Sequence, residues 1–223
     1  MIGTSKIFTA KPFAAPAGNS NRVILTISNE YGCGAYAISR LAASELGYEF
    51  VDEQLPVVVA KRLRTSPEAV ESAEDLNQTV GERMLRVLEL GTPEVDSTKD
   101  PNFDEQCLRE VQLAVREYAD HGNVLLFGRG AGAILGRRAG LLRIFMHAPK
   151  PWRIAHVMDG SGVDEKTALE EIERIDRARR DYLKTYYGQN WGDPAHYDLS
   201  LDTSIFGRDG SAAIIVRAAS VVP

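Results

Sequence analysis

The feature that most constrains the fold of this chain is a short apolar run, followed by a turn with two glycines and then by a helical pattern. The run Val23–Ile27 is rich in branched aliphatic residues, which is typical of a buried strand. Gly32 and Gly34 lie in the turn, and the helical pattern ends at Gly47, a typical C-cap residue. This order predicts a loop that holds phosphate oxygens with backbone N–H groups and a helix N-terminus.

The predicted loop lacks the lysine of a Walker A motif. That motif requires Lys and then Ser or Thr directly after its last glycine, whereas Ala35 and Tyr36 follow Gly34 here. The glycines still allow the backbone to approach phosphate oxygens closely, because they carry no Cβ. A plain tight turn without a ligand is the structural alternative.

Short apolar runs alternate with helical patterns through the rest of the chain. Residues 1–21 show no clear period and predict a mobile tail, and 22–223 form one domain. A long helix is expected between Asp164 and Gly188, and a last helix after Gly207. The alternation predicts an α/β fold, a five-stranded parallel sheet with helices on both faces. The further strands are expected at 48–51, 124–127, 141–146 and 197–201.

Composition and charge exclude several classes of function. The formal net charge of -5 argues against a strongly basic nucleic-acid binder. No apolar run approaches a membrane span, and the N-terminus lacks the core of a signal peptide. Two cysteines are too few for a disulfide framework or a zinc site, and the four histidines show no metal-ligand spacing. We therefore expect a cytoplasmic protein that binds neither nucleic acid nor membranes and has no metal site of its own.

Several chemically useful residues follow predicted strands. Asp52, Arg129 and the segment from Asp202 to Ser204 each come directly after a strand, as the glycine turn does. Ligands of open α/β sheets bind beyond the carboxyl ends of the strands. We therefore expect these residues to converge at that edge, and the basic helix 174–184 could close over them.

Four segments carry a family resemblance: Thr26–Gly34, Phe127–Ala131, Ile175–Tyr182 and Gly188–Pro194. Together they resemble the cytidylate-kinase-like family, a divergent branch of the P-loop nucleoside monophosphate kinases. The resemblance covers roughly Val23 to Gly207 and implies a strand order of 2-3-1-4-5. It also implies a nucleoside-monophosphate-binding insert at about 53–110 and a lid at about 160–195.

The resemblance implies that the glycine turn holds the phosphates of ATP, with Mg²⁺ as the metal cofactor. Ala35 stands where the parent enzymes carry the catalytic Lys, and Asn29 stands where they carry the first Gly. Tyr36 occupies a position at which the divergent branch usually has Arg. Backbone N–H groups, Mg²⁺ and lid arginines would then have to hold the phosphates. The cofactor-binding residues are expected to be Tyr31, Gly32, Cys33, Gly34, Ala35 and Tyr36.

Arg129 resembles the arginine that holds the acceptor phosphate in cytidylate kinases. A guanidinium suits this task because it grips two phosphate oxygens at once. Gly130 stands where the parent enzymes carry an Asp, so one substrate or metal contact is missing. Asp52 is a candidate to orient substrate or a metal-bound water. A surface salt bridge for Arg129 and a strand-end cap for Asp52 are the alternatives.

The basic helix resembles the parental pattern Arg-x-x-x-Asp-x-x-Arg. Arg177, Asp181 and Lys184 occupy its positions, and spacings of four and three place them on one helix face. In the parent enzymes this face contacts the acceptor and the transferred phosphoryl group, so these residues and Arg129 are the catalytic candidates. Arg180 is a further candidate for substrate binding. A solvated helix face with Glu–Arg pairs is the alternative.

Three kinds of function are consistent with these residues. The first is an enzyme that transfers the γ-phosphoryl group of ATP to a nucleoside monophosphate, CMP or dCMP by resemblance. The second is a nucleotide-binding module that has lost turnover, which the departures at Ala35, Tyr36, Gly130 and Lys184 favour. The third is an interaction protein in which Tyr36 fills the phosphate space.

Overall fold

The computed structural model describes residues 22–52, 54–74 and 102–223. The predicted mobile tail at 1–21 and the middle of the predicted insert lie outside the described residues. No helix within the three described ranges combines the length and the apolar character needed to cross a bilayer.

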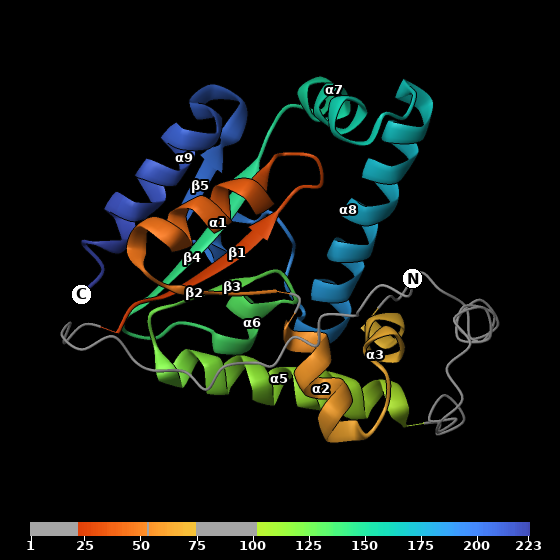
Figure 1. The fold of residues 1–223 in the computed structure, drawn as a ribbon, viewed down its shortest axis with the longest axis vertical. Helices are drawn as coiled ribbons and strands as arrows, with labels where there is room; N and C mark the ends of the chain where they lie inside the picture. The colour runs from red at the N-terminus through yellow and green to blue at the C-terminus, as the bar shows by residue number, and fades with distance from the viewer. Residues whose placement is uncertain (1–21, 53, 75–101) are drawn as a thin grey trace, which may run out of the picture.

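Five parallel strands form one sheet in the order β2-β3-β1-β4-β5 (Figure 1). This confirms the predicted α/β fold and the strand order that the family resemblance implies. The central strand β1 pairs with β3 on one side and with β4 on the other. The strands are β1 (Ile24–Asn29), β2 (Glu49–Val51), β3 (Val124–Phe127), β4 (Leu141–His147) and β5 (Leu199–Asp202).

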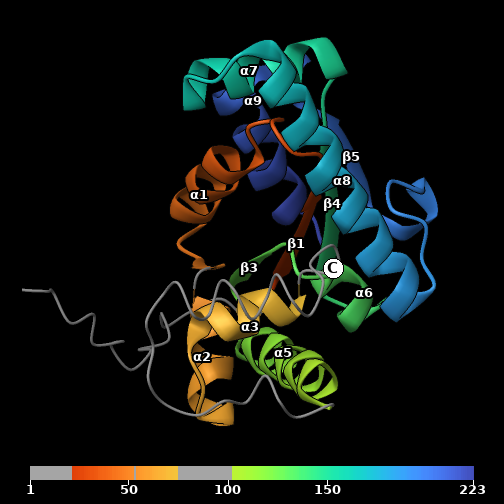
Figure 2. The ribbon, with the colours of Figure 1, turned by 90° about the vertical axis from the view of Figure 1, so that its right-hand side faces the viewer.

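Successive side chains of a strand point to opposite faces of the sheet, so that each face carries apolar side chains. Helices cover both faces. Leu25 and Ile27 of β1 pack into a core with α1 (Ala35–Leu46) and α9 (Thr203–Ala219). Ile24 points to the opposite core, which is completed by four helices (Figures 1 and 2). These are α2 (Gln54–Leu63), α3 (Pro67–Glu74), α5 (Phe103–His121) and α6 (Ala131–Leu135).

Two further helices follow β4 and pack against each other beside the carboxyl edge of the sheet (Figure 2). They are α7 (Lys150–Ser161) and α8 (Glu165–Tyr187). The predicted bounds of the long helix are confirmed: the Asp164 carboxylate accepts a hydrogen bond from the Thr167 N–H at 2.8 Å, and Gly188 caps the other end in the left-handed conformation. Helix α8 is therefore a well-capped rod that runs past the ends of the strands.

The last helix differs from the prediction at its start. It begins at Thr203, where the Asp202 carboxylate accepts a hydrogen bond from the Ser204 N–H, rather than after Gly207. Gly207 has a φ of 63° and breaks the helix internally. The N-cap at Asp202 therefore starts the helix early, and the glycine produces a kink instead of a boundary. The short helix α6 was not predicted, because the glycine-rich sequence around it indicates only a turn.

Candidate functional site

The glycine turn has the backbone conformation that its sequence predicts. Gly32 and Gly34 have φ values of 80° and 75°, a region that side-chain-bearing residues rarely adopt. A Cβ on Gly32 would lie 2.8 Å from Cγ2 of Val157, so the turn packs closely against α7. Gly34 caps α1, and the helix N-terminus begins at Ala35, as a phosphate-binding loop requires.

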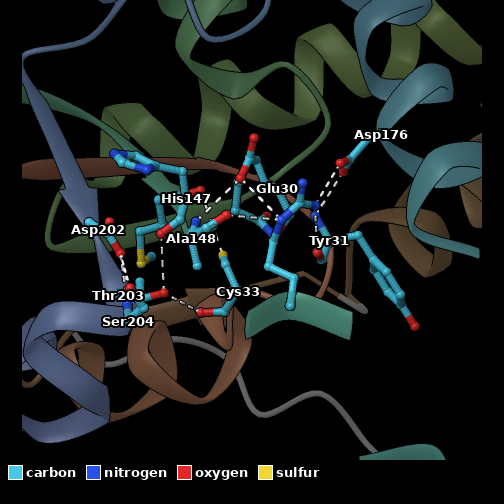
Figure 3. Close-up of polar contacts among 12 residues, drawn as sticks. Glu30, Tyr31, Cys33, His147, Ala148, Asp176, Asp202, Thr203 and Ser204 are labelled. Carbon is cyan, nitrogen blue, oxygen red and sulfur yellow. Dashed lines mark hydrogen bonds and ion pairs between the residues drawn. The ribbon is translucent and has the colours of Figure 1, made fainter. Parts of the chain in front are cut away.

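A buried cluster of charges fixes the start of this turn to α7 and α8 (Figure 3). The Arg153 guanidinium donates to the carbonyl of Tyr31 at 3.0 Å and to the Asp176 carboxylate at 2.7 Å. Glu30 pairs with Arg153 at 3.2 Å and accepts from the N–H of Ala148. The second Asp176 oxygen accepts from the N–H of Tyr31 at 2.8 Å. That amide, predicted to contact phosphate, is therefore already used inside the protein.

Cys33 is a structural part of the turn. Its side chain is buried, its Sγ lies 3.6 Å from the carbonyl of Met146, and burial raises the pKa of the thiol to about 11. The Thr203 hydroxyl lies 2.7 Å from the Cys33 carbonyl and 3.2 Å from that of His147 (Figure 3). The turn is thus held to β4 and α9, and the thiol stays protonated at neutral pH.

Tyr36 packs on aromatic side chains at the ends of β2 and β3. Its ring meets those of Phe50 and Phe127 edge-on, with centroid distances of 5.4 and 5.6 Å. The Arg40 guanidinium lies 5.9 Å from the centre of the Tyr36 ring. These contacts place the ring on the sheet edge and give no support to the interpretation that Tyr36 fills the phosphate space.

A cavity of about 330 Å³ lies between the end of β1, the turn after β3 and helix α8. The predicted cofactor-binding residues at 31–36 are not among the residues that line it. Its wall combines arginines from two elements with apolar and aromatic side chains of α8, and Glu71 of α3 contributes one carboxylate. An excess of arginine at the carboxyl edge of a parallel sheet favours an anionic ligand. The lining residues are Ser28, Asn29, Glu71, Gly128, Arg129, Gly130, Arg174, Ile175, Ala178, Arg179, Tyr182, Leu183 and Trp191.

Arg129 is held in the cavity by an unusual stretch of backbone. It has a φ of 50°, between Gly128 at 73° and Gly130 at 68°. A Cβ on Gly130 would lie 3.0 Å from the Tyr187 ring, so α8 packs directly over this turn. Burial lowers the pKa of the Arg129 guanidinium, although nearby Asp52 opposes this shift. Left-handed backbone at a non-glycine residue is typical of functional sites.

Asp52, the residue predicted to orient substrate or a metal-bound water, directly follows β2 and is partly buried. Its charge influences both Arg129 and Arg179, which places it beside the arginine-rich wall. Its own backbone N–H donates to the Gln54 side chain at 3.1 Å. Asp52 therefore stands next to the cavity without forming part of its lining.

The predicted catalytic face of α8 does not point into the cavity. Arg177, Asp181 and Lys184 are exposed, and the Lys184 ammonium group donates to Asn190 at 3.2 Å. Arg180 is also exposed and lines a separate cleft beyond β4 and β5, where its guanidinium lies 5.9 Å from the centre of the Trp191 ring. The prediction that these residues act in catalysis or substrate binding therefore receives no support from their placement.

A set of residues with the same spacing, two positions nearer the start of α8, does face the cavity. Ile175, Arg179 and Tyr182 lie four and three residues apart, and all three line it. The Arg179 guanidinium donates to the carbonyl of Asn29 at 2.6 Å, and burial lowers its pKa. Arg179 was not among the predicted site residues. The apolar period of the helix, with Ile172 and Leu183 buried, could have indicated the correct face.

The described residues offer no protein-built metal site. No group of three or more His, Cys, Asp or Glu side chains in those ranges is arranged to hold a metal ion. Asp202, at the carboxyl end of β5, caps α9, and its hydrogen bonds from Ser204 lower the pKa of its carboxyl group.

A family sequence model and several related proteins that match this chain point to the same family. The sequence model of the cytidylate kinase-like family matches residues 24–205. A cytidylate kinase from Pyrococcus horikoshii is 28% identical over 200 residues, which cover 89% of this chain and 88% of that protein. A cytidylate kinase from Thermococcus kodakarensis is 25% identical over 196 residues, covering 88% and 87%.

Other similarities are shorter or concern the fold alone. A uronate isomerase from Corynebacterium glutamicum is 31% identical over 124 residues, but this chain spans only 24% of its length. A cytidylate kinase from Methanopyrus kandleri is 30% identical over 117 residues, and 61% of its length is spanned. The crystal structure of an uncharacterized protein from Eubacterium ventriosum has a TM-score of 0.62 at 20% identity, over 90% of this chain and 99% of that one.

Proposed function

The chain belongs to the cytidylate kinase-like family, and from this premise we propose that it transfers the γ-phosphoryl group of MgATP to a nucleoside monophosphate. CMP and dCMP are the first acceptors to test, because several similar proteins are cytidylate kinases. The observation that carries the proposal is the cavity at the carboxyl edge, which lies between the end of β1, directly before the glycine turn, and the arginines of α8 and of the turn after β3.

Each part of the cavity has a task in such a reaction. The N-terminus of α1 and the backbone after Gly32 bind the phosphates of ATP. Arg129 binds the phosphate of the acceptor, since its guanidinium is fixed in the cavity wall and can contact two oxygens. When MgATP is bound, its Mg²⁺ ion would neutralise charge on the phosphates. Catalysis then consists of aligning the two substrates and stabilising the developing charge.

The direct test is an assay for nucleoside diphosphate with ATP, Mg²⁺ and each of CMP, dCMP, UMP and AMP. Diphosphate above a no-protein control, formed from at least one acceptor, is the expected result. Arg129→Ala should raise the KM for that acceptor by about tenfold or more, because a hydrogen-bonded charge pair is lost. Arg116→Ala on the exposed side of α5 is the matched control. An unchanged acceptor KM in Arg129→Ala would remove this residue from the acceptor site.

A second candidate function is nucleotide binding without turnover. Ala35 in place of a lysine, Gly130 in place of an acidic residue and the occupied N–H of Tyr31 favour it. It predicts that ATP raises the melting temperature while no diphosphate forms with any acceptor. Product formation with any of the four acceptors would exclude it.

A further inference from the structure

We propose that Arg179 supplies the cation that the glycine turn lacks, and that it contacts the phosphates of ATP from helix α8. This inference rests on the proposed phosphoryl transfer and assigns a specific residue to it. Ala35, the first residue of α1, stands at the position of the missing lysine, and its side chain is buried in the core that α1 shares with β1 and α9. The positive charge must therefore come from another part of the chain.

Arg179 is placed where such a cation is needed. Its guanidinium donates to the carbonyl of Asn29, the residue at which the glycine turn begins, at 2.6 Å. Asn29 and Arg179 both line the cavity, together with Ser28 at the end of β1. The guanidinium therefore lies on the cavity side of the turn, although it comes from a residue 150 positions away in the chain.

Among the described residues, the Arg179 guanidinium forms no ion pair with a carboxylate. Both oxygens of the nearest acidic side chain on the helix, Asp176, are already engaged, one by Tyr31 and one by Arg153. Within residues 22–52, 54–74 and 102–223, the one hydrogen bond of the Arg179 guanidinium goes to a neutral carbonyl. A partly buried cation is costly unless an anion compensates it, so this site is suited to an anionic ligand.

The helix that carries Arg179 is fixed relative to the turn. Asp176 lies one helical turn before Arg179 and binds the N–H of Tyr31 at 2.8 Å. Asp176 also pairs with Arg153 of α7, which itself contacts the Tyr31 carbonyl. The guanidinium is therefore held in position before any ligand binds, and little side-chain entropy remains to be lost on binding.

The test compares three proteins: the wild type, Arg179→Met and Arg116→Met. We expect Arg179→Met to lower kcat/KM for ATP by about 100-fold or more, as when a preorganised charge contact is removed. Arg116→Met, on an exposed surface of α5, should behave as the wild type. Melting temperatures without ligand establish that each variant is folded.

Binding measurements separate this inference from the proposed function. In thermal shift assays, Arg179→Met should lose stabilisation by ATP and keep stabilisation by CMP, whereas Arg129→Ala should show the reverse. This pattern supports the role of Arg179 even if the wild type forms no diphosphate, a result that would overturn only the phosphoryl transfer. Unchanged ATP stabilisation and unchanged kcat/KM in a folded Arg179→Met protein would overturn the inference. The inference would also be overturned if Arg177→Met lost both ATP stabilisation and kcat/KM while Arg179→Met kept them.

Discussion

Two arginines contact backbone carbonyls of the same glycine turn, yet their surroundings differ. Arg153 of α7 is 4% exposed and pairs with the carboxylates of Glu30 and Asp176. Arg179 of α8 contacts the carbonyl of Asn29 and, in the described part of the chain, has no carboxylate within ion-pairing distance. The first is compensated inside the protein and the second faces a cavity. An arginine that has carboxylate partners therefore has a structural role, whereas an arginine without them is suited to bind a ligand.

A third arginine fits the same division. Arg143 of β4 is buried and makes two hydrogen bonds to the Asp198 carboxylate, at 3.0 and 2.7 Å. Such a bidentate pair satisfies both charges within the protein. Arg143 and Arg153 therefore belong to the structural class, and substitutions of the two classes should change different measured quantities.

The largest effect on stability is expected for Arg153→Met. It would leave the Glu30 and Asp176 carboxylates partly or fully buried without their cation, and breaking such a pair costs about 3–5 kcal/mol. The free energy of unfolding, measured by urea denaturation, should fall by about that amount. The double variant Arg153→Met/Asp176→Asn should lose less than the two single losses combined, because the charges interact. If the double variant lost as much free energy of unfolding as the two single variants combined, the charges of Arg153 and Asp176 would not interact. That result would contradict the structural role of Arg153.

A smaller effect is expected for Asp198→Asn. Its carboxylate is partly exposed, so the loss at neutral pH should be about 1 kcal/mol after solvent screening. Hydrogen bonds from Arg143 hold the pKa of Asp198 below its usual 3.8, and this stabilisation is present above about pH 4 and lost as the pH falls through the lowered pKa. The difference from the wild type should therefore shrink in acid. A difference that grows below pH 4 would contradict the pairing.

The smallest effect is expected for Tyr36→Leu. The variant loses the edge-on contacts with Phe50 and Phe127, which are worth about 1 kcal/mol. ATP should stabilise this variant as strongly as the wild type, in contrast to Arg179→Met. Stronger binding of ATP or of inorganic phosphate by Tyr36→Leu would instead mean that the tyrosine competes for the phosphate space. Thermal shift titrations with both ligands distinguish these outcomes.

The candidate site was predicted in part. Arg129, which follows β3, lines the cavity because parallel strands direct their carboxyl ends to one edge. The predicted cofactor-binding residues at 31–36 do not line it. The residues on α8 are different. A spacing of four and three shows that Arg177, Asp181 and Lys184 share a face, but it does not show whether that face meets the cavity or the solvent. Packing of Ile172 and Leu183 against the rest of the protein turns the neighbouring face inward.

The order of the strands in the sheet came from the family resemblance, whereas the sequence by itself determined most of the helices and strands. Those depend on local signals: apolar periodicity, helix caps such as Asp164, and glycines where the backbone needs a positive φ. Only the tertiary structure decided which charges meet. Tyr31 and Asp176 are 145 residues apart, and Asn29 and Arg179 are 150 apart. Burial and pairing of charges over such separations depend on how the elements pack, and no local pattern specifies them.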